Sequence, residues 1–158
     1  MFIDSIKNFP KQFEYQPEIK NAGELPRRKI FIVLGMGGSH LAADLIASYK
    51  PEEDIIVHSD YGLDFPESVL ADALIIASSY SGNTEETLSS LKDAKEKNAQ
   101  VIGITSNGKL ADECKKVIKI PFGFQPRAAL GYTFFPMLGV LHNAKIAKVK
   151  NDELNEML

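Results

Sequence analysis

Two short loops in this sequence combine glycines with hydroxyl side chains just before a helical segment. The first loop is Gly35–Ser39 (GMGGS), and the second loop is Ser79–Thr84 (SYSGNT). Glycines let the backbone turn tightly and approach an anion, while a helix N-terminus offers free N–H groups at the positive end of its dipole. Hydroxyls and amides can surround a phosphate without a lysine, so we expect the two loops to form one phosphate pocket.

Each loop also has a simpler interpretation. A glycine-rich turn between a strand and a helix is often only a tight connection. The first loop is not a dinucleotide fingerprint, which would need glycine where His40 stands, and it is not a Walker loop, because no Gly-Lys-Ser/Thr follows. In the second loop, Asn83 followed by Glu86 fits a helix N-cap with an acidic third position, but a cap leaves the three hydroxyls unexplained. Glu85 and Glu86 would complement the helix dipole without any catalytic role.

Arg127 is the cation that chemistry at such a pocket could use. It follows Pro126, a residue type favoured at the first position of a helix. A cation in the first turn opposes the helix dipole at a cost of about 0.3–1 kcal/mol, and an anion in an adjacent pocket would reverse that sign. The alternative is a surface arginine with a solvated head group.

The histidines and Asp60 are weaker candidates. We expect His40, beside the first loop, to cap or line a helix, and we expect His58 and His142 to be packing or surface residues. The three histidines lack metal-ligand spacing, so no metal site is predicted. Asp60 follows the second predicted strand, where dinucleotide enzymes hold a ribose hydroxyl, which keeps a nucleotide-binding interpretation open.

Alternating apolar runs and helical segments must position these residues. The sequence predicts five strands, at Lys29–Leu34, Asp54–His58, Ala73–Ala77, Val101–Thr105 and Val117–Ile120. It predicts helices at residues 2–14, Ser39–Tyr49, Thr84–Lys97, Lys109–Cys114 and Arg127–Ala147, the last bent at Pro136. Short apolar strands that alternate with helices are typical of a three-layer α/β/α sandwich with a parallel sheet. Ligands of such sheets bind beyond the carboxyl ends of the strands, where both loops lie.

Length and composition limit the classes of protein to consider. The chain has 158 residues, which suits one domain, and its net charge of −3 argues against a nucleic-acid or anionic-membrane surface. Cys114 is the only cysteine, so an internal disulfide is excluded and a reducing cytoplasm is the expected location. The N-terminus lacks the apolar core of a signal peptide, and no apolar run approaches the ~18 residues of a membrane span.

The two loops, in this order on these elements, resemble the sugar isomerase (SIS) domain. With Gln125–Tyr132 (QPRAALGY), the sequence is similar to the N-terminal SIS domain of bifunctional phosphoglucose/phosphomannose isomerases, over essentially the whole chain. The resemblance implies a flavodoxin-like strand order and reversible aldose–ketose isomerisation through a cis-enediol, without cofactor or metal. It implies that Arg127 stabilises an enediolate. The implied phosphate-binding residues are Gly37, Gly38, Ser39, Ser79, Ser81 and Thr84.

That family carries two SIS domains, and the resemblance places the carboxylate base, a histidine and a lysine in the second. We therefore expect residues 1–150 to be one SIS domain and residues 151–158 to be a linker or the start of a second, so that the chain is either a fragment or a natural single-domain relative. This chain should bind hexose 6-phosphate, isomerise it poorly alone, and form a homodimer or pack against a second SIS domain. A non-catalytic sugar-phosphate sensor and a dinucleotide-binding domain are the alternative functions.

Overall fold

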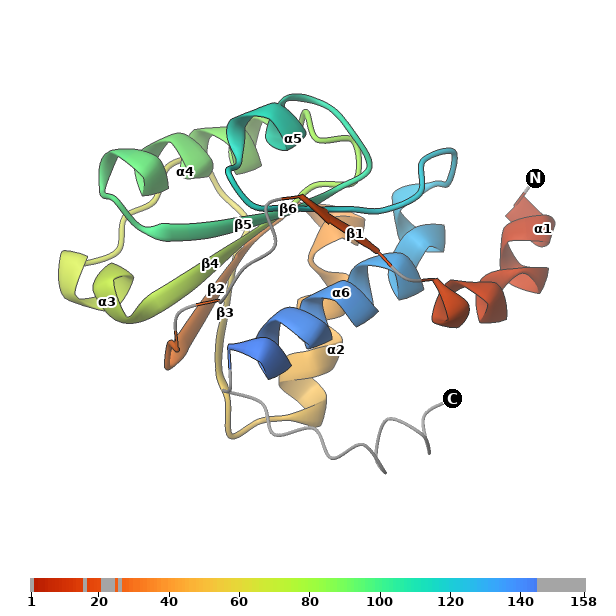
Figure 1. The fold of residues 1–158 in the computed structure, drawn as a ribbon, viewed down its shortest axis with the longest axis horizontal. Helices are drawn as coiled ribbons and strands as arrows, with labels where there is room; N and C mark the ends of the chain where they lie inside the picture. Colours follow the sequence, from red (N-terminus) through yellow and green to blue (C-terminus); the bar gives the residue numbers. More distant parts are fainter. Residues whose placement is uncertain (1, 16, 21–24, 26, 145–158) are drawn as a thin grey trace.

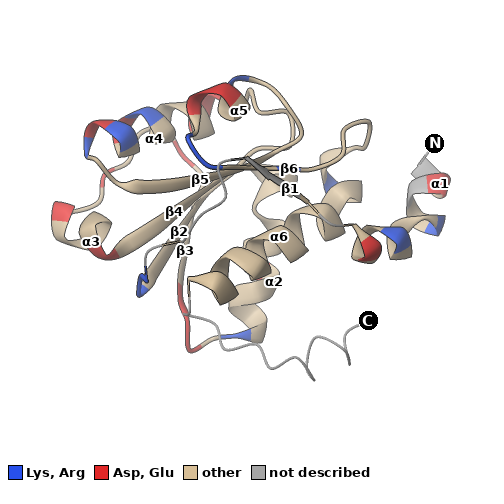
Figure 2. Cartoon of the chain, viewed as in Figure 1, with Lys and Arg blue, Asp and Glu red and all other residues tan. Residues whose placement is uncertain are grey.

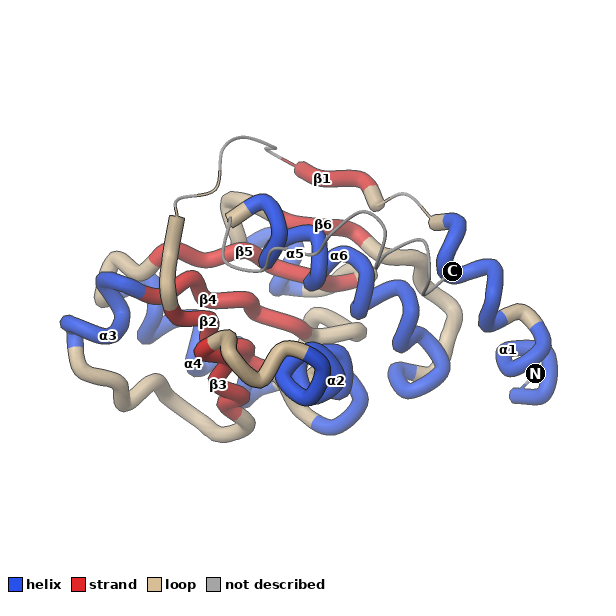
Figure 3. The backbone as a smooth tube through the Cα atoms, turned by 90° about the horizontal axis from the view of Figure 1, so that it is seen from below, coloured by secondary structure: helices blue, strands red, loops and turns tan. Residues whose placement is uncertain are grey.

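A central sheet organises the molecule, of which the computed structural model describes residues 2–15, 17–20, 25 and 27–144. In spatial order the strands are β1 (Glu18–Lys20), β6 (Val117–Lys119), β5 (Gln100–Thr105), β4 (Ala73–Ser78), β2 (Ile30–Leu34) and β3 (Asp54–His58). Strands β2 to β6 are parallel and follow the flavodoxin-like order, which confirms the predicted fold class. Strand β1 was not predicted, and it pairs antiparallel with β6 at one edge (Figure 3).

Helices cover both faces of this sheet (Figure 1). On one face lie α2 (Leu41–Tyr49) and α6 (Leu130–Asn143), and on the other lie α3 (Glu67–Asp72), α4 (Glu85–Glu96) and α5 (Lys109–Glu113). Strand β2 serves both layers, because Phe31 and Val33 pack toward α2 and α6 while Ile32 and Leu34 pack toward the opposite helices. A strand buried on both faces needs a continuous apolar run, which is what made β2 predictable.

Helices α4 and α6, on opposite faces of the sheet, differ in charge (Figure 2). Helix α4 alternates acidic and basic residues along its exposed side, whereas α6 carries no Lys, Arg, Asp or Glu. Helix α6 packs against the sheet, against α2 and against the N-terminal segment, so few of its side chains are left to meet water.

The N-terminal segment differs from the single helix predicted for residues 2–14. Helix α1 (Phe2–Lys7) ends before Asn8, and a separate 3-10 helix, η1 (Phe9–Glu14), follows. Pro10 sits in the first turn of η1, where its missing N–H costs nothing, but its ring cannot continue α1.

Other boundaries also moved. Helix α3 was not predicted. The helix expected from Arg127 begins at Leu130, after a 3-10 turn, η3 (Pro126–Ala129), and residues 145–147 of that prediction lie outside the described residues. A further 3-10 turn, η2 (Gly37–Ser39), precedes α2, which ends at Tyr49, just before Lys50 and Pro51, as predicted.

Candidate functional site

The first and second loops meet beyond the carboxyl ends of the sheet strands. Gly35 directly follows β2 and Ser79 directly follows β4, and these two strands are hydrogen-bonded neighbours. The Ser78 hydroxyl donates to the Ser39 carbonyl at 2.7 Å, and the Tyr80 N–H donates to the Ser39 hydroxyl at 3.2 Å. The loops are therefore in direct contact, and Ser39 is nearly buried between them at 6% exposure.

The second loop is folded on itself by its own polar groups. The Ser79 and Thr84 hydroxyls share a hydrogen bond of 2.8 Å, and the Gly82 N–H donates to the Ser79 hydroxyl at 3.1 Å. Ser81 is exposed, and its hydroxyl accepts from the Asn83 N–H at 3.2 Å. Gly82 has φ +70°, and a Cβ there would collide with the Asn107 carbonyl, so only glycine fits.

Asn83 does not cap α4, so the simpler interpretation of this residue as a helix cap is wrong. Thr84 occupies the N-cap position and makes no side-chain capping bond. The Asn83 side-chain oxygen instead accepts from the Lys109 N–H at 3.1 Å, which ties the second loop to the start of α5. Glu85 and Glu86 form the acidic first turn of α4, as the dipole argument expects.

A third loop, Ser106–Gly108 after β5, supports the second loop and was not singled out from the sequence. The Ser106 N–H and hydroxyl both donate to the Tyr80 carbonyl, at 3.2 and 2.6 Å. Gly108 has φ +80°, and a Cβ there would collide with the Ser81 carbonyl. The loop that follows β5 therefore supports the second loop, which follows the neighbouring strand β4.

Tyr80 links the second loop to the segment that leads to Arg127, and sequence reasoning also missed it. Its hydroxyl donates to the Pro121 carbonyl at 2.9 Å and accepts from the Phe124 N–H at 2.9 Å. The side chain is 8% exposed, and burial raises the pKa of its phenol. The only sequence signal was an aromatic residue placed between two serines.

Arg127 lies in η3, and the backbone of this turn packs against the first loop. A Cβ at Gly38 would stand 3.1 Å from the Arg127 backbone N and 3.2 Å from the Pro126 carbonyl carbon, so glycine permits the close approach. The Arg127 side chain is exposed, and no described residue forms a hydrogen bond or ion pair with it. The structure therefore brings three of the predicted features together: the two loops and the backbone of Arg127. We call η3, the turn that carries this residue, the arginine turn.

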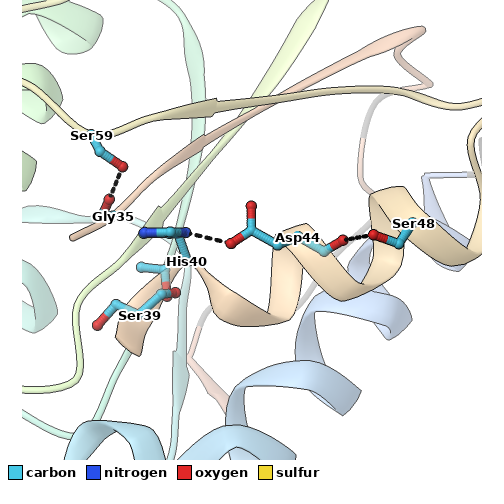
Figure 4. A network of polar contacts seen from close by, with 7 residues as sticks. Gly35, Ser39, His40, Asp44, Ser48 and Ser59 are labelled. Atoms are coloured by element: carbon cyan, nitrogen blue, oxygen red, sulfur yellow. Dashed lines mark hydrogen bonds and ion pairs between the residues drawn. The ribbon is translucent and has the colours of Figure 1, made fainter. Parts of the chain in front are cut away.

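His40 is oriented along α2 and does not cap it. Its Nδ1 lies 2.7 Å from Asp44 Oδ2, one helical turn further on, and the ring points toward that carboxylate (Figure 4). His40 holds the N-cap position without a side-chain capping bond, so of the two roles expected for it, lining the helix is the one that fits. Nearby, the Ser59 hydroxyl donates to the Gly35 carbonyl at 2.7 Å and steadies the start of the first loop.

The remaining candidates have local structural roles. His58 Nε2 lies 2.7 Å from the Gly62 carbonyl, and its ring packs edge-on against Phe65. Asp60 accepts from the Tyr61 N–H at 2.7 Å, and His142 is exposed in the last turn of α6. Among the described residues no three His, Cys, Asp or Glu side chains gather in a group that could hold a metal ion.

Comparison with known proteins identifies the family. The SIS domain profile matches residues 24–142. The bifunctional phosphoglucose/phosphomannose isomerase of Caldicellulosiruptor bescii is 40% identical over 165 residues, which cover 98% of this chain and 48% of that protein. The chain thus spans about half the length of that relative.

Solved structures share the fold. The Vibrio vulnificus NanR protein complexed with ManNAc-6P superposes with a TM-score of 0.58 at 14% identity, covering 98% of this chain and 59% of that one. The sugar isomerase domain of the RpiR transcription factor from Sphaerobacter thermophilus gives 0.55 at 16% identity, covering 99% and 94%. In the described part of the chain, no helix has both the length and the apolar character needed to cross a bilayer.

Proposed function

The chain belongs to the SIS domain family, and on that premise we propose that it binds the phosphate of a hexose 6-phosphate as part of an aldose–ketose isomerase. The substrates would be glucose 6-phosphate or mannose 6-phosphate, and the product fructose 6-phosphate. The name that the Caldicellulosiruptor relative carries, at 40% identity, supports this choice of sugars.

The contact between the two serine-bearing loops is the observation that carries the proposal. The two loops are joined by direct hydrogen bonds beyond the carboxyl ends of the strands, and they carry the hydroxyl residues Ser39, Ser79, Ser81 and Thr84. Ser79 and Thr84 bond to each other, and a bound phosphate could take over those two hydroxyls. Because Thr84 leaves α4 uncapped by its side chain, N–H groups at that helix start also remain for an anion. Gly37 and Gly38 would let the backbone of the first loop approach the same phosphate.

Arg127 would act at the other end of the sugar. In the proposed reaction the ring opens, a base removes the C2 proton, and the resulting cis-enediol is reprotonated at C1. Negative charge develops on the oxygens at C1 and C2 during this transfer. A guanidinium held beside them would stabilise that charge without transferring protons. The Arg127 guanidinium is exposed and has no hydrogen-bond or ion-pair partner among the described residues.

The base would come from outside this chain. Glu85 and Glu86 follow Thr84 directly, so a phosphate bound at Thr84 would leave both carboxylates near C6 rather than C2. The chain covers 48% and 46% of two curated relatives, which supports residues 1–150 as one SIS domain and residues 151–158 as a linker or the start of another. We place the whole protein in the cytoplasm and expect it to work without a metal or redox cofactor.

Calorimetric titration tests the proposal directly. Glucose 6-phosphate, mannose 6-phosphate and fructose 6-phosphate should each bind one site per chain, whereas unphosphorylated glucose should not bind detectably. NAD⁺ serves as the comparison for a dinucleotide site at Asp60. Binding of NAD⁺ without binding of any hexose phosphate would overturn the proposal.

The alternative is a sugar-phosphate sensor without catalysis, and it predicts the same titration. The fold likeness to NanR and to the RpiR factor is compatible with either function, because at 14% and 16% identity it concerns the fold alone. The two functions separate in a coupled isomerase assay of this chain joined to a second SIS domain, in which only the enzyme turns over.

A further inference from the structure

A glutamine in the N-terminal segment is buried beside the arginine turn. Gln12 lies in η1 and is 1% exposed, although its neighbours Lys11 and Glu14 are exposed. It stands outside the region matched by the SIS domain profile, which begins at residue 24. Burial of an amide is costly unless its polar atoms are paired, so the partners of Gln12 indicate what it holds.

Those partners are all backbone groups at the junction of η3 and α6. The Gln12 Nε2 donates to the Ala128 carbonyl at 2.6 Å. Its Oε1 accepts from the Gly131 N–H at 2.9 Å and from the Tyr132 N–H at 3.3 Å. A Cβ at Gly131 would stand 2.8 Å from the Gln12 Cβ, so this glycine makes room for the side chain. Ala129, at the N-cap of α6, offers no side-chain acceptor, and Gln12 supplies one from a distant segment.

The segment that carries Gln12 is itself fixed to α6 and to the sheet. The ring of Phe13 packs edge-on against Phe135 with centroids 5.0 Å apart, and Tyr15 packs edge-on against Tyr132 at 5.2 Å. The Tyr15 hydroxyl also donates to the Lys119 carbonyl at 3.1 Å. The segment that carries Gln12 is therefore held in place by its own contacts with α6 and the sheet.

The arginine turn is consequently supported from two sides. Gly38 of the first loop contacts the backbone of Pro126 and Arg127, and Gln12 holds the carbonyl of the next residue, Ala128. An exposed arginine without a described partner is placed only by the backbone that bears it, so the position of the turn decides where its head group can reach.

We propose that Gln12 is a positioning residue that holds the Pro126–Ala129 turn against the first loop and so presets Arg127 over the bound sugar. The inference rests on the proposed function, since it assigns Gln12 a role through Arg127. Gln12 itself touches no substrate. Its removal should weaken recognition of the sugar end of the ligand and spare recognition of the phosphate.

A double-mutant cycle with two ligands tests this. The variants are Gln12→Met, which keeps the length but removes both polar atoms, Arg127→Ala, and the two combined. The ligands are inorganic phosphate and 5-phosphoarabinonate, an aldonate whose carboxylate carries charge where the enediolate would. Gln12→Met should weaken aldonate binding about tenfold in the presence of Arg127 and have no effect in the Arg127→Ala background, because coupled residues are non-additive. Its affinity for inorganic phosphate should stay within about twofold of wild type.

Lys11→Ala is the matched control, since it changes the exposed residue beside Gln12 and leaves the packing of the segment and the turn intact, and it should leave both affinities unchanged. If Gln12→Met does not fold, Gln12→Glu replaces it, because the carboxylate still accepts from Gly131 and Tyr132 but no longer donates to Ala128. An equal loss of aldonate affinity with and without Arg127, or no loss at all, would overturn the positioning role. A wild-type chain that binds neither ligand would instead overturn the proposed function and this inference with it.

Discussion

The hydroxyl of Ser79 lies 2.8 Å from that of Thr84, so one hydrogen bond joins the two ends of the second loop. Replacing both Ser79 and Ser81 by alanine should abolish the stabilisation that hexose 6-phosphates give to the wild-type chain. A ligand at about 100 times its Kd adds about 2.7 kcal/mol, which should raise the wild-type melting temperature by roughly 5–10 °C. Differential scanning fluorimetry with and without fructose 6-phosphate measures the shift.

Ser48→Ala is the control for this experiment, because Ser48 is an exposed serine on α2 whose hydroxyl donates to the Asp44 carbonyl and to no other group in the described part of the chain. Since Ser79 also accepts from Gly82, the Ser81→Ala single variant should be tested beside the double variant. An undiminished ligand shift in the double variant would move the phosphate site elsewhere.

When this chain is joined to the second SIS domain that the proposed function requires, Arg127→Lys should lower turnover far more than substrate affinity. Lysine keeps the charge but loses the planar fork of donors, and the interaction strengthens only as negative charge develops. We expect kcat to fall by about 10²-fold, with KM changed much less. Steady-state kinetics at saturating glucose 6-phosphate provide the measurement, and wild-type turnover would show that Arg127 is only structural.

The 158-residue chain alone should bind fructose 6-phosphate but isomerise it poorly. General acid–base catalysis contributes about 10²–10⁴-fold, and under the proposed function this chain would supply phosphate binding and a cation but no base near C2. A coupled assay with a glucose 6-phosphate-specific dehydrogenase reads out the activity. Turnover typical of metabolic enzymes would contradict the idea and direct attention to His40, the histidine beside the first loop.

The isolated chain should form a symmetric homodimer, with a two-fold axis in place of the packing of two SIS domains. Helix α2 presents Leu45 and Tyr49 one turn apart, and they are 48% and 45% exposed. Multi-angle light scattering at rising concentration measures the mass. A chain that remains monomeric at high concentration would count against the dimer.

Cys114 should resist modification while the protein is folded. Burial raises the pKa of its thiol from 9.0 to about 11, so almost no thiolate exists at pH 8. Between pH 9 and pH 11 the unfolded chain loses this proton while the folded chain keeps it, so the free energy of unfolding should fall with rising pH across that window. Denaturant unfolding at pH 8 and pH 10 should show this fall in wild type and a smaller one in Cys114→Ala. Rapid reaction of the native thiol with Ellman's reagent at pH 8 would contradict the prediction.

The parts of the fold that could be predicted are those that a local pattern of residues indicates. The run of apolar residues in β2 indicates burial on both faces, and the glycines after it indicate where the strand ends. The meeting of Ser39 with Ser78 and Tyr80 followed once the strands were parallel and β2 neighboured β4.

The parts that could not be predicted depend on partners far away in the chain. Strand β1 has the sequence EIK and is a strand only because β6 pairs with it. Gln12 lies within the helix predicted for residues 2–14, and no local pattern indicates its role, because the backbone groups that it bonds belong to residues 128–132. Tyr80 likewise gained its role from Pro121 and Phe124, which no local pattern connects to it.

The antiparallel strand β1 has a consequence for the order of folding. Its register joins Glu18 to Lys119, and Gln12 joins the same early segment to Ala128, so both contacts close loops of about a hundred residues. Contacts of such high sequence separation form late, after the local β-α units have condensed. We therefore expect the first twenty residues to dock as a final step onto an already assembled sheet. Until they do, β6 presents an unpaired edge to which a second chain could add, so the N-terminal segment also protects the folding protein against aggregation.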